Sequence, residues 1–385
     1  MTMRGYKRAD GLVGIRNHVI VLPTSVCASE TAIRIAAGVS GTVALPHTHG
    51  CCQMGNDKRQ TVNTLVGLGA NPNVAAVLVV TLGCEGVEAK DVVAGIESSR
   101  KPVQVVGIQD CGGTTATVER GTAALRRLFE AAACCEKAPI DLADIILGME
   151  CGGSDATSGL VANPVLGVVS DRIVEAGGTS ILSETTELIG AEHILARRAR
   201  DDKVADDILR IVKQTEDRAK SMGEDIRGSQ PTPGNIEGGI TTIEEKSLGC
   251  IYKAGSAPIE GVIEYAERPP GKGLYVMDTP GQDIESITGM VAGGAQVLLF
   301  TTGRGTPTGC PIAPVIKITG NGATYRNMEE NIDINAGEVI DSGVSIEEMA
   351  GCALGELVEV CNGKQTKAET SGHREFGIHR VGFTF

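Results

Sequence analysis

The chain has 385 residues, with 48 acidic and 35 basic side chains, and its formal net charge is −13. This size suggests two domains, and the balance of 42% hydrophobic and 22% charged residues excludes a disordered or fibrous chain. The acidic balance and the few aromatic residues argue against a nucleic-acid partner, because phosphate binding needs a positive stripe. A small anionic substrate is still compatible, since a local site can be positive on an acidic body.

The sequence has no apolar run of the roughly 18 residues needed to span a bilayer. Its first residues, MTMRGYKRADG, have no apolar signal core. We therefore expect a cytoplasmic protein without a membrane partner. The 12 cysteines are irregularly spaced, which favours reduced thiols with metal or catalytic roles for some of them.

The first part of the chain alternates apolar runs with amphipathic stretches. Short β-branched runs predict buried strands at 18–22, 42–45, 75–82 and 103–108. Apolar residues three and four apart predict helices at 28–38, 57–69, 87–99 and 114–134. This βαβ series predicts a doubly wound, Rossmann-like α/β domain over residues 1–138, ending in a connector at 137–141.

The second part predicts another α/β domain over residues 139–385. Strands are expected at 143–148, 273–277, 296–301 and 314–319. Helices are expected at 164–176, 187–222, 283–292 and 345–361. The Pro- and Gly-rich stretch at 229–235 is expected to be a loop. The predicted fold class is therefore two α/β domains with largely parallel sheets.

Four of the predicted strands end in Gly-rich turns that contain a thiol or an imidazole. These turns are PHTHGCC at 46–52, GCE at 83–85, ECGGSD at 150–155 and TGRGTPTGC at 302–310. In open α/β sheets, ligands bind beyond the carboxyl ends of the strands. We therefore expect a site at these turns.

Most cytosolic cysteines are small buried hydrophobic residues. That interpretation fits Cys27, Cys134, Cys135, Cys250, Cys352 and Cys361. Cys51, Cys84 and Cys310 differ, because each has a neighbouring glycine or lies at a predicted strand end. Three thiolates suit an iron–sulfur cluster or zinc, and zinc is the weaker option because the chain has no CxxC pair.

His47 and His49 lie two residues apart, so on an extended strand end they point the same way, as two ligands or an acid/base pair would. A structural role is the alternative for both. His18, at a strand start, is interpreted as structural, and His373 and His379 lie in a polar tail.

The turn CGGSD at 151–155 precedes a predicted helix, and its backbone N–H groups can hold a carboxylate or phosphate. Such a turn is also common without a ligand, and GRGTPTG at 303–309 is equally ambiguous. No Walker loop, no GxGxxG after the first strand and no GxSxG occurs, so nucleotide cofactors and serine hydrolysis have no support.

Blocks along the whole chain resemble the altronate/galactarate dehydratase family. They are GYKRADGLVGIRNHVIVLPT (5–24), HTHGC (47–51), NPNVAAVLVVTLGCE (71–85), ECGGSDATSGLVANP (150–164), SETTELIGAEH (183–193), PTPGNI (231–236), MDTPGQD (277–283), FTTGRGTPTGCPIAPVIK (300–317) and IDINAG (332–337). The resemblance implies a lyase that acts on a sugar acid and needs iron. It also implies that these are the second and C-terminal domains of the full-length enzymes, so we expect a separate small subunit to supply the first domain.

A related branch is the large subunit of sulfolactate sulfo-lyase, which GNIEGGITTIEEKSLG (234–249), GAEH (190–193) and GHREF (372–376) resemble. That branch does not keep the thiols that match Cys51, Cys84 and Cys310, so we favour water over sulfite as the leaving group. A non-catalytic subunit that binds an iron–sulfur cluster or a sugar acid is a further alternative. The particular sugar acid and the oligomeric state stay open, although a homo-oligomer is compatible.

The resemblance leads to a hypothesis for the site. Cys51, Cys84 and Cys310 would hold iron, as a mononuclear Fe²⁺ or as an iron–sulfur cluster with one substrate-facing iron. His47 or His49 would be the acid or base. Glu85 would orient one of the metal ligands by a hydrogen bond. Substrate binding is assigned to Gly152, Gly153, Ser154, Asp155, Arg304 and Thr308.

Overall fold

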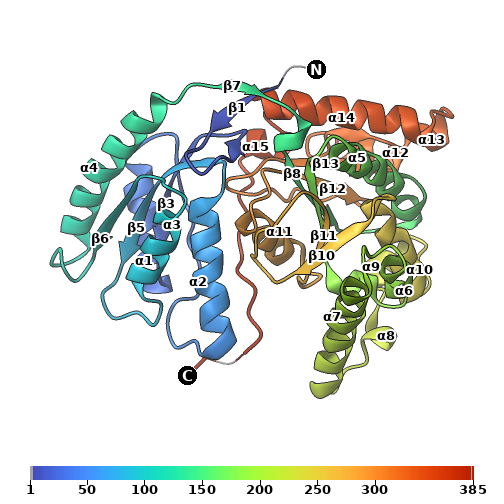
Figure 1. Cartoon of the computed structure of the whole chain (residues 1–385), viewed down its shortest axis with the longest axis horizontal. Coiled ribbons are helices and arrows are strands. Elements are labelled where there is room, and N and C mark those ends of the chain that lie inside the picture. The colour runs from blue at the N-terminus through green and yellow to red at the C-terminus, as the bar shows by residue number, and fades with distance from the viewer. Residues whose placement is uncertain (1–2, 383) are drawn as a thin grey trace.

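A computed structural model describes residues 3–382 and 384–385. The described part contains two parallel sheets and a small antiparallel sheet beside them (Figure 1). The predicted fold class, α/β with largely parallel sheets, is confirmed. Among the described residues, no helix combines the length and the apolar character needed to cross a membrane.

The first sheet has the strand order β4-β3-β5-β6, and neighbouring strands are parallel. Its strands are β3 (His18–Pro23), β4 (Thr42–Ala44), β5 (Val74–Thr81) and β6 (Val103–Gly107). On one face pack α1 (Val26–Ala37) and α4 (Thr114–Ala133), and on the other pack α2 (Gly55–Ala70) and α3 (Ala89–Glu97). Every residue of β5 is buried, because this central strand is covered on both faces. The predicted Rossmann-like layering is present.

The second sheet has the order β10-β11-β9-β8-β12-β13-β14 and is also parallel. Its strands are β8 (Ile146–Cys151), β9 (Thr179–Leu182), β10 (Ile259–Ile263), β11 (Gly273–Met277), β12 (Val297–Thr302), β13 (Val315–Thr319) and β14 (Ile334–Asn335). Its two faces are covered by α5 (Asn163–Glu175), α7 (Asp202–Ser221) and α14 (Ile346–Asn362) on one side, and by α11 (Asp283–Ala292) on the other.

The remaining elements lie at the edges of these layers. The antiparallel sheet consists of β1 (Met3–Lys7), β2 (Val13–Gly14) and β7 (Ala138–Ile140). The other helices are α6 (Glu192–Ala196), α8 (Ile226–Ser229), α9 (Pro233–Glu237), α10 (Ile243–Cys250), α12 (Gly322–Asn327), α13 (Glu338–Asp341) and α15 (Lys367–Ser371). Short 3₁₀ turns are η1 (Leu142–Asp144), η3 (Thr185–Leu188) and η4 (Ile251–Ala254), and η2 (Ser158–Ala162) is a π-helical turn.

The two sheet layers share one hydrophobic core. Ile20 and Leu65 of the first layer belong to the same buried cluster as Met290 and Phe300 of the second. Helix α2 lies beside α11 at this boundary (Figure 1). The Asn71 side chain donates hydrogen bonds from the end of α2 to the carbonyls of Val291 (2.7 Å) and Ala295 (3.0 Å). The predicted domain boundary between residues 138 and 139 stays a prediction.

Two sequence predictions about local structure are wrong. The stretch 187–222 is not one helix: Gly190 has a positive φ of 91°, and α7 starts only after Asp201, whose carboxylate accepts from the Val204 N–H. Residues 229–235 are not entirely loop, because α9 begins at Pro233, with Thr232 as its N-cap.

The interpretation of six cysteines as buried hydrophobic residues is also partly wrong. Cys250 and Cys361 are buried, but Cys27, Cys134, Cys135 and Cys352 are exposed. Cys134 and Cys135 directly follow α4, where the helix ends at the surface. Every cysteine lies in the described part of the chain, and all are free thiols.

Candidate active site at the carboxyl ends of the second sheet

Strands β8 and β12 are neighbours, and the chain leaves them in opposite directions. β8 continues to β9 on one side, and β12 continues to β13 on the other. Such a topological switch point opens a crevice beyond the carboxyl ends of the two strands, where α/β proteins bind ligands. The loops that follow β8 and β12 are the ones that the sequence assigned to substrate binding.

Backbone hydrogen bonds join these two loops. Gly152 N donates to Thr301 O (3.1 Å), and Gly303 N and Arg304 N both donate to Gly153 O (3.2 and 2.9 Å). Gly303 has no room for a Cβ, because the atom would overlap the Asp155 carboxyl group. The structure therefore brings the predicted residues of both loops together at the switch point.

Ser154 and Asp155 are buried in the first of these loops. One carboxylate oxygen of Asp155 accepts from the Thr157 hydroxyl (2.6 Å) and the Ser158 N–H (3.1 Å), and the other accepts from the Asn321 amide (3.0 Å). These bonds fix the turn that leads into η2. Asp155 thus orders the site and has little capacity left to accept from a ligand.

Arg304 and Thr308 lie in the second loop. Arg304 is exposed, and its guanidinium forms a 2.9 Å ion pair with Glu237 of α9. The Thr308 hydroxyl shares a 2.8 Å hydrogen bond with the Thr306 hydroxyl. Both side chains are at the switch point, and both are already partnered.

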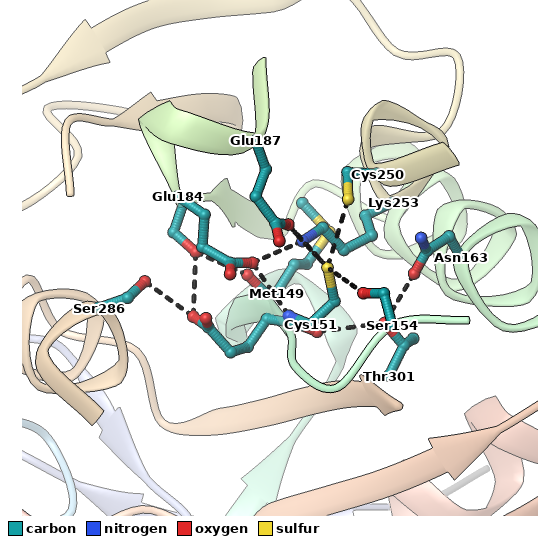
Figure 2. Close-up of polar contacts among 12 residues, drawn as sticks. Met149, Cys151, Ser154, Asn163, Glu184, Glu187, Cys250, Lys253, Ser286 and Thr301 are labelled. Atoms are coloured by element: carbon teal, nitrogen blue, oxygen red, sulfur yellow. Dashed lines mark hydrogen bonds and ion pairs between the residues drawn. The ribbon is translucent and has the colours of Figure 1, made fainter. Parts of the chain in front are cut away.

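A buried polar cluster that the sequence analysis missed lies beneath the switch point. Figure 2 shows Cys151 within this cluster, and its sulfur is contacted by the side chains of Ser154, Glu187, Cys250 and Lys253. The Lys253 ammonium donates to Cys151 Sγ (2.9 Å) and to Glu184 Oε2 (2.6 Å), and lies 3.4 Å from Glu187 Oε2. The Cys151 thiol donates to Glu187 Oε2 (2.8 Å) and lies 3.5 Å from Cys250 Sγ.

The ionisation of Lys253 and Glu187 depends on the charged groups that lie next to them. Burial by itself lowers the pKa of Lys253, but the acidic groups around it, including Glu184 and Glu187, raise that pKa well above its usual value. Burial raises the pKa of Glu187, but Lys246 and Lys253 lower it to about 2. Lys253 is therefore a buried ammonium ion and Glu187 a buried carboxylate.

Three carboxyl groups form the next part of the cluster. Among the described residues, Glu150, Glu184 and Asp283 are one of the groups whose ligand atoms all lie within 4.8 Å of one another. Burial, followed by the charges of Glu184 and Asp283, raises the pKa of Glu150 well above its usual range. Burial and the neighbouring glutamates raise the pKa of Asp283 to about 7. The three groups cannot all be ionised without a compensating proton or cation.

Two oxygens of these carboxyl groups can bind a cation or share a proton, since the Glu150 and Glu184 carboxyl groups lie within hydrogen-bond reach of each other. Glu150 Oε2 accepts from the Ser286 and Ser183 hydroxyls (2.7 and 3.2 Å), whereas Glu150 Oε1 and Glu184 Oε1 are buried without a hydrogen-bond partner. Gly152 has no room for a Cβ, which would overlap the Asp283 carboxyl group. Carboxylate oxygens that converge in this way suit a hard divalent cation. The group therefore fits Fe²⁺ as well as Mg²⁺ or Mn²⁺.

A second group with metal-ligating chemistry consists of Cys151, Glu187 and Cys250. Here two ammonium groups already contact the potential ligand atoms, whereas in the group of Glu150, Glu184 and Asp283, Lys253 contacts one oxygen, Glu184 Oε2. Lys253 contacts Cys151 and Glu187, and Lys246 lies 3.2 Å from Glu187 Oε1. The carboxyl group of three is therefore the better candidate for a metal.

The predicted metal ligands Cys51, Cys84 and Cys310 lie elsewhere. Cys51 and Cys84 are exposed on adjacent loops at the carboxyl edge of the first sheet, joined by a hydrogen bond from Val87 N to Gly50 O (3.0 Å). Cys310 is buried in the core shared by the two layers. Burial raises the pKa of Cys310 to about 11, although hydrogen bonds from the N–H groups of Ile312 and Ala313 to its sulfur act in the opposite direction. Backbone N–H groups also donate to the sulfurs of metal-bound thiolates.

Among the described residues, the potential metal ligands whose ligand atoms all lie within 4.8 Å of one another do not include Cys51, Cys84 and Cys310 as a group. Their joint ligation of iron stays a prediction.

Both predicted histidines are buried, with stacked rings whose centroids are 6.3 Å apart. His47 Nε2 bonds to Pro23 O (2.8 Å), and its Nδ1 accepts from His49 N (3.2 Å). His49 Nε2 bonds to Ile378 O (2.9 Å), and its Nδ1 faces the Gln53 amide (3.4 Å). Burial lowers the pKa of His47 to about 4 and also lowers that of His49. Acid or base catalysis by either ring would require one of these bonds to open.

Glu85 is occupied by its own loop. Its carboxylate accepts from the Thr24 hydroxyl (2.6 Å) and from the N–H groups of Leu82 (3.2 Å) and Gly83 (2.6 Å). Burial raises the pKa of Glu85, but these hydrogen bonds outweigh burial and lower it. A catalytic role for Glu85 stays a prediction, and the contacts show a carboxylate that orders the turn containing Cys84.

The cluster could have been found from the position rule that identified the other turns. Glu184 follows β9 and Asp283 follows β11, so both lie beyond strand ends. Three blocks that carry the family resemblance also meet here: ECGGSD contributes Glu150 and Cys151, SETTEL contributes Glu184 and Glu187, and MDTPGQD contributes Asp283. The short strand β9 was not predicted, so Glu184 had no strand end to follow.

Comparison with known proteins agrees with this resemblance. Residues 142–384 match the family model described as D-galactarate/Altronate dehydratase, C-terminal, and residues 5–133 match D-galactarate dehydratase/Altronate hydrolase, second domain. The chain belongs to the galactarate/altronate dehydratase family. The match to the C-terminal model contains the whole cluster beneath the switch point, and the match to the second-domain model contains Cys51, Cys84, His47 and His49.

Relatives in this family include two kinds of lyase. The chain is 40% identical to the (2R)-sulfolactate sulfo-lyase subunit beta of Chromohalobacter salexigens, over 99% of this chain and 97% of the relative. It is 35% identical to the altronate dehydratase of Escherichia coli, over 98% of this chain and 78% of the relative. It is 33% identical to the galactarate dehydratase (L-threo-forming) of E. coli, over 94% of this chain and 73% of the relative. The dehydratases therefore have additional chain that this sequence does not match.

Proposed function

We propose that the chain is the large subunit of a hydro-lyase that dehydrates a sugar acid of the altronate or galactarate type to a 2-keto-3-deoxy acid. The observation that supports this proposal is the group of Glu150, Glu184 and Asp283 beneath the switch point. In this reaction, the proton next to the substrate carboxylate is removed, the hydroxyl on the following carbon leaves as water, and the resulting enol becomes a ketone. Both bond-breaking steps create charge that the site must stabilise.

Iron fits this site through its oxygen ligands. Glu150, Glu184 and Asp283 would hold the ion, and a bound Fe²⁺ supplies Lewis acidity toward a carboxylate and a leaving hydroxyl. The chain's own loops bind and orient the substrate: Ser154 and Thr308 offer hydroxyls, and Arg304 offers a guanidinium when it releases Glu237. His47 or His49 remains the predicted acid or base. This role would require one of the hydrogen bonds of its imidazole nitrogens to break.

The three cysteines are the alternative ligand set for iron, and they would favour a cluster over a single ion. Anaerobic purification followed by iron and acid-labile sulfide analysis distinguishes the two. Iron without sulfide supports the carboxylate site, whereas iron and sulfide in equal amounts supports a cluster. A metal-free, fully active enzyme would refute the iron proposal.

The second candidate function is a sulfo-lyase that expels sulfite from sulfolactate. It is favoured by the match to subunit beta of the sulfo-lyase, which spans 97% of that relative and leaves almost no unmatched chain. The same match supports a separate small subunit as the partner of this chain. A cytoplasmic location and the assembly into a homo-oligomer stay predictions.

The decisive experiment is a substrate comparison. The chain and a small partner subunit would be purified together under anaerobic conditions with Fe²⁺ and assayed with altronate, galactarate and (2R)-sulfolactate. Formation of a 2-keto-3-deoxy acid supports the hydro-lyase, and release of sulfite supports the second candidate. Binding without turnover of any of the three acids would support a non-catalytic subunit and contradict both.

A further inference from the structure

The C-terminal segment His373–Gly382 connects loops that lie far apart in the sequence. It runs between the two sheet layers, beside α2, toward the C-terminus (Figure 1). The Glu375 carboxylate accepts from Gly309 N (2.8 Å) in the loop that follows β12. The Ile378 carbonyl accepts from His49 Nε2, and the Val381 N–H donates to Asp57 of α2 (2.8 Å). One short segment therefore contacts the predicted site loops of both layers.

The same segment is fixed to the start of α11. His379 Nδ1 lies 2.8 Å from Glu285 Oε2, and the Tyr265 hydroxyl donates to the Glu285 carbonyl (2.7 Å). His379 N in turn donates to the Tyr265 hydroxyl (3.2 Å). Glu285 is two residues beyond Asp283, so the segment also holds the helix turn that presents one carboxyl group of the candidate site.

The loop that follows β12 is held from a second direction by Lys317. This side chain projects from β13, is fully buried, and donates from Nζ to Thr308 O (2.9 Å) and Pro307 O (3.3 Å). Burial lowers the pKa of Lys317 to about 8, and the nearby Asp333 and Glu375 carboxylates offset only part of this decrease. Lys317 lies beneath the loop with no exposed surface, so it acts on the loop and not on a ligand.

Gly309 lies where the two restraints meet. A Cβ at this position would lie 2.5 Å from the His373 carbonyl oxygen, so the backbone of the tail packs directly on the backbone of the loop. Glu375 closes this contact with a charge-assisted hydrogen bond, which is stronger than a neutral one. His373 Nδ1 bonds to the other carboxylate oxygen of Glu375 (2.9 Å) and holds it in this orientation.

We propose that Glu375 and Lys317 are positioning residues for the reaction: they clamp the loop Gly303–Cys310 at the switch point, and the segment His373–Gly382 ties this clamped loop to the loop His47–His49 of the other layer. The inference rests on the proposed function, since the clamped loop contains Arg304 and Thr308, the residues assigned to the substrate. It gives a role to the tail histidines His373 and His379, which the sequence analysis left unassigned.

Hydrogen–deuterium exchange of the complete chain tests the clamp without requiring turnover. Glu375→Ala removes the acceptor for Gly309 N, whereas Glu375→Gln keeps an oxygen in that position and serves as the rescue variant. Arg374→Ala, at the exposed neighbouring residue, is the matched control. We expect exchange at 303–310 to become at least about tenfold faster in Glu375→Ala, the effect of losing one hydrogen bond to a charged group. It should be intermediate in Glu375→Gln, which keeps a neutral acceptor, and should stay at the wild-type rate in Arg374→Ala.

The coupling between the two layers has its own readout. Glu375→Ala is expected to speed exchange at 47–52 as well, since Ile378 O holds His49 from the same segment. In the assembled enzyme, Glu375→Ala should raise KM for the acid about tenfold with a smaller change in kcat, because the loop that binds substrate is loosened. Gly309→Ala should reproduce both effects by pushing the tail away from the loop.

Unchanged exchange at 303–310 in both Glu375→Ala and Gly309→Ala would overturn the proposal. If the wild-type enzyme turns over none of the tested acids, the proposed function fails, but the exchange result still decides whether the clamp exists.

Discussion

Lys253 and Glu184 form an ion pair of 2.6 Å in which the two side chains are 1% and 0% exposed. Removal of one partner from a buried pair leaves the other charge uncompensated, which costs about 3–5 kcal/mol. We therefore expect Lys253→Met to lower the free energy of unfolding by about this amount, as measured by urea denaturation. In the folded variant, Cys151 should react more slowly with a thiol reagent, because the ammonium that stabilises its thiolate form is gone.

The matched control for this prediction is Lys213→Met. Lys213 also forms a 2.6 Å ion pair, with Asp217, but the two side chains are 73% and 55% exposed. Water screens such a pair, so the denaturation midpoint should stay unchanged. Equal effects of the two substitutions would show that the buried cluster is not charged as described.

A second prediction concerns Gly152, which lies under the Asp283 carboxyl group. An added Cβ would overlap that group and would lie 2.8 Å from Phe300 Cζ, so Gly152→Ala must displace Asp283 or the strand end. We expect the variant to fold but to lose metal binding and turnover, measured by metal analysis and by the substrate assay. Both contacts are with side chains, and since Phe300 is fully buried in the core, the Asp283 carboxyl group is the one that must move.

Gly355 provides the control for this substitution. It lies within α14, and an added Cβ would meet no atom within 4 Å. Gly355→Ala should therefore stabilise the chain by about 0.5–1 kcal/mol, the difference in helix propensity, and leave metal binding intact. Loss of metal in both variants would point to general disturbance of the fold.

The third prediction is a pH dependence that His47 imposes on stability. Burial lowers the folded-state pKa of His47 to about 4, whereas the unfolded chain has the ordinary value of 6.5. Between these values the unfolded state binds the extra proton, so His47 stabilises the fold fully above pH 6.5 and loses this contribution as the pH falls toward 4. The contribution amounts to up to about 3 kcal/mol.

A His47→Gln variant isolates this term from the other titrating groups. At pH 7 the variant should be less stable than the wild type, because it loses the ring contacts, and the difference in unfolding free energy should shrink as the pH falls to 4. Denaturant curves of both proteins at several pH values measure this difference. A difference that stays constant with pH would mean that His47 titrates normally in the folded state.

Much of the fold followed from the sequence because its strands are recognisable one by one. β5 and β12 are continuous apolar runs that end in glycine-containing turns, and both were predicted within one residue at each end. β9 contains only four residues, TSIL, and β10 contains a glycine, so neither shows a clear strand pattern. Gly190 and Asp201 interrupt the charged stretch 187–222, whose helical composition hid the interruption.

The site was harder to predict because its chemistry depends on long-range pairing. Ser154 and Arg304 were assigned to one site, and the order of β8 and β12 in the sheet brings their loops together. The order of the strands also decides that Glu184 lies beside Glu150, and this order cannot be read from local patterns. Thiols at strand ends are conspicuous in a sequence, whereas glutamates are common, so Cys84 attracted attention and Glu184 did not.

The last prediction concerns which residues bind the metal. A cation that binds only the folded chain stabilises it, by about 2.7 kcal/mol when its free concentration is 100 times its Kd. We expect this gain on anaerobic addition of Fe²⁺ or of Mn²⁺, which is stable in air, and we expect Glu150→Gln to abolish it. Burial favours the neutral form of Glu150 when no cation is present, so the amide is a close mimic and should leave the stability of the metal-free chain nearly unchanged.

Cys84→Ser is the matched comparison, since Cys84 is exposed and far from the carboxyl cluster in the chain. Retention of the gain in Cys84→Ser and its loss in Glu150→Gln would assign the ion to the carboxyl groups, and the reverse pattern would assign it to the cysteines.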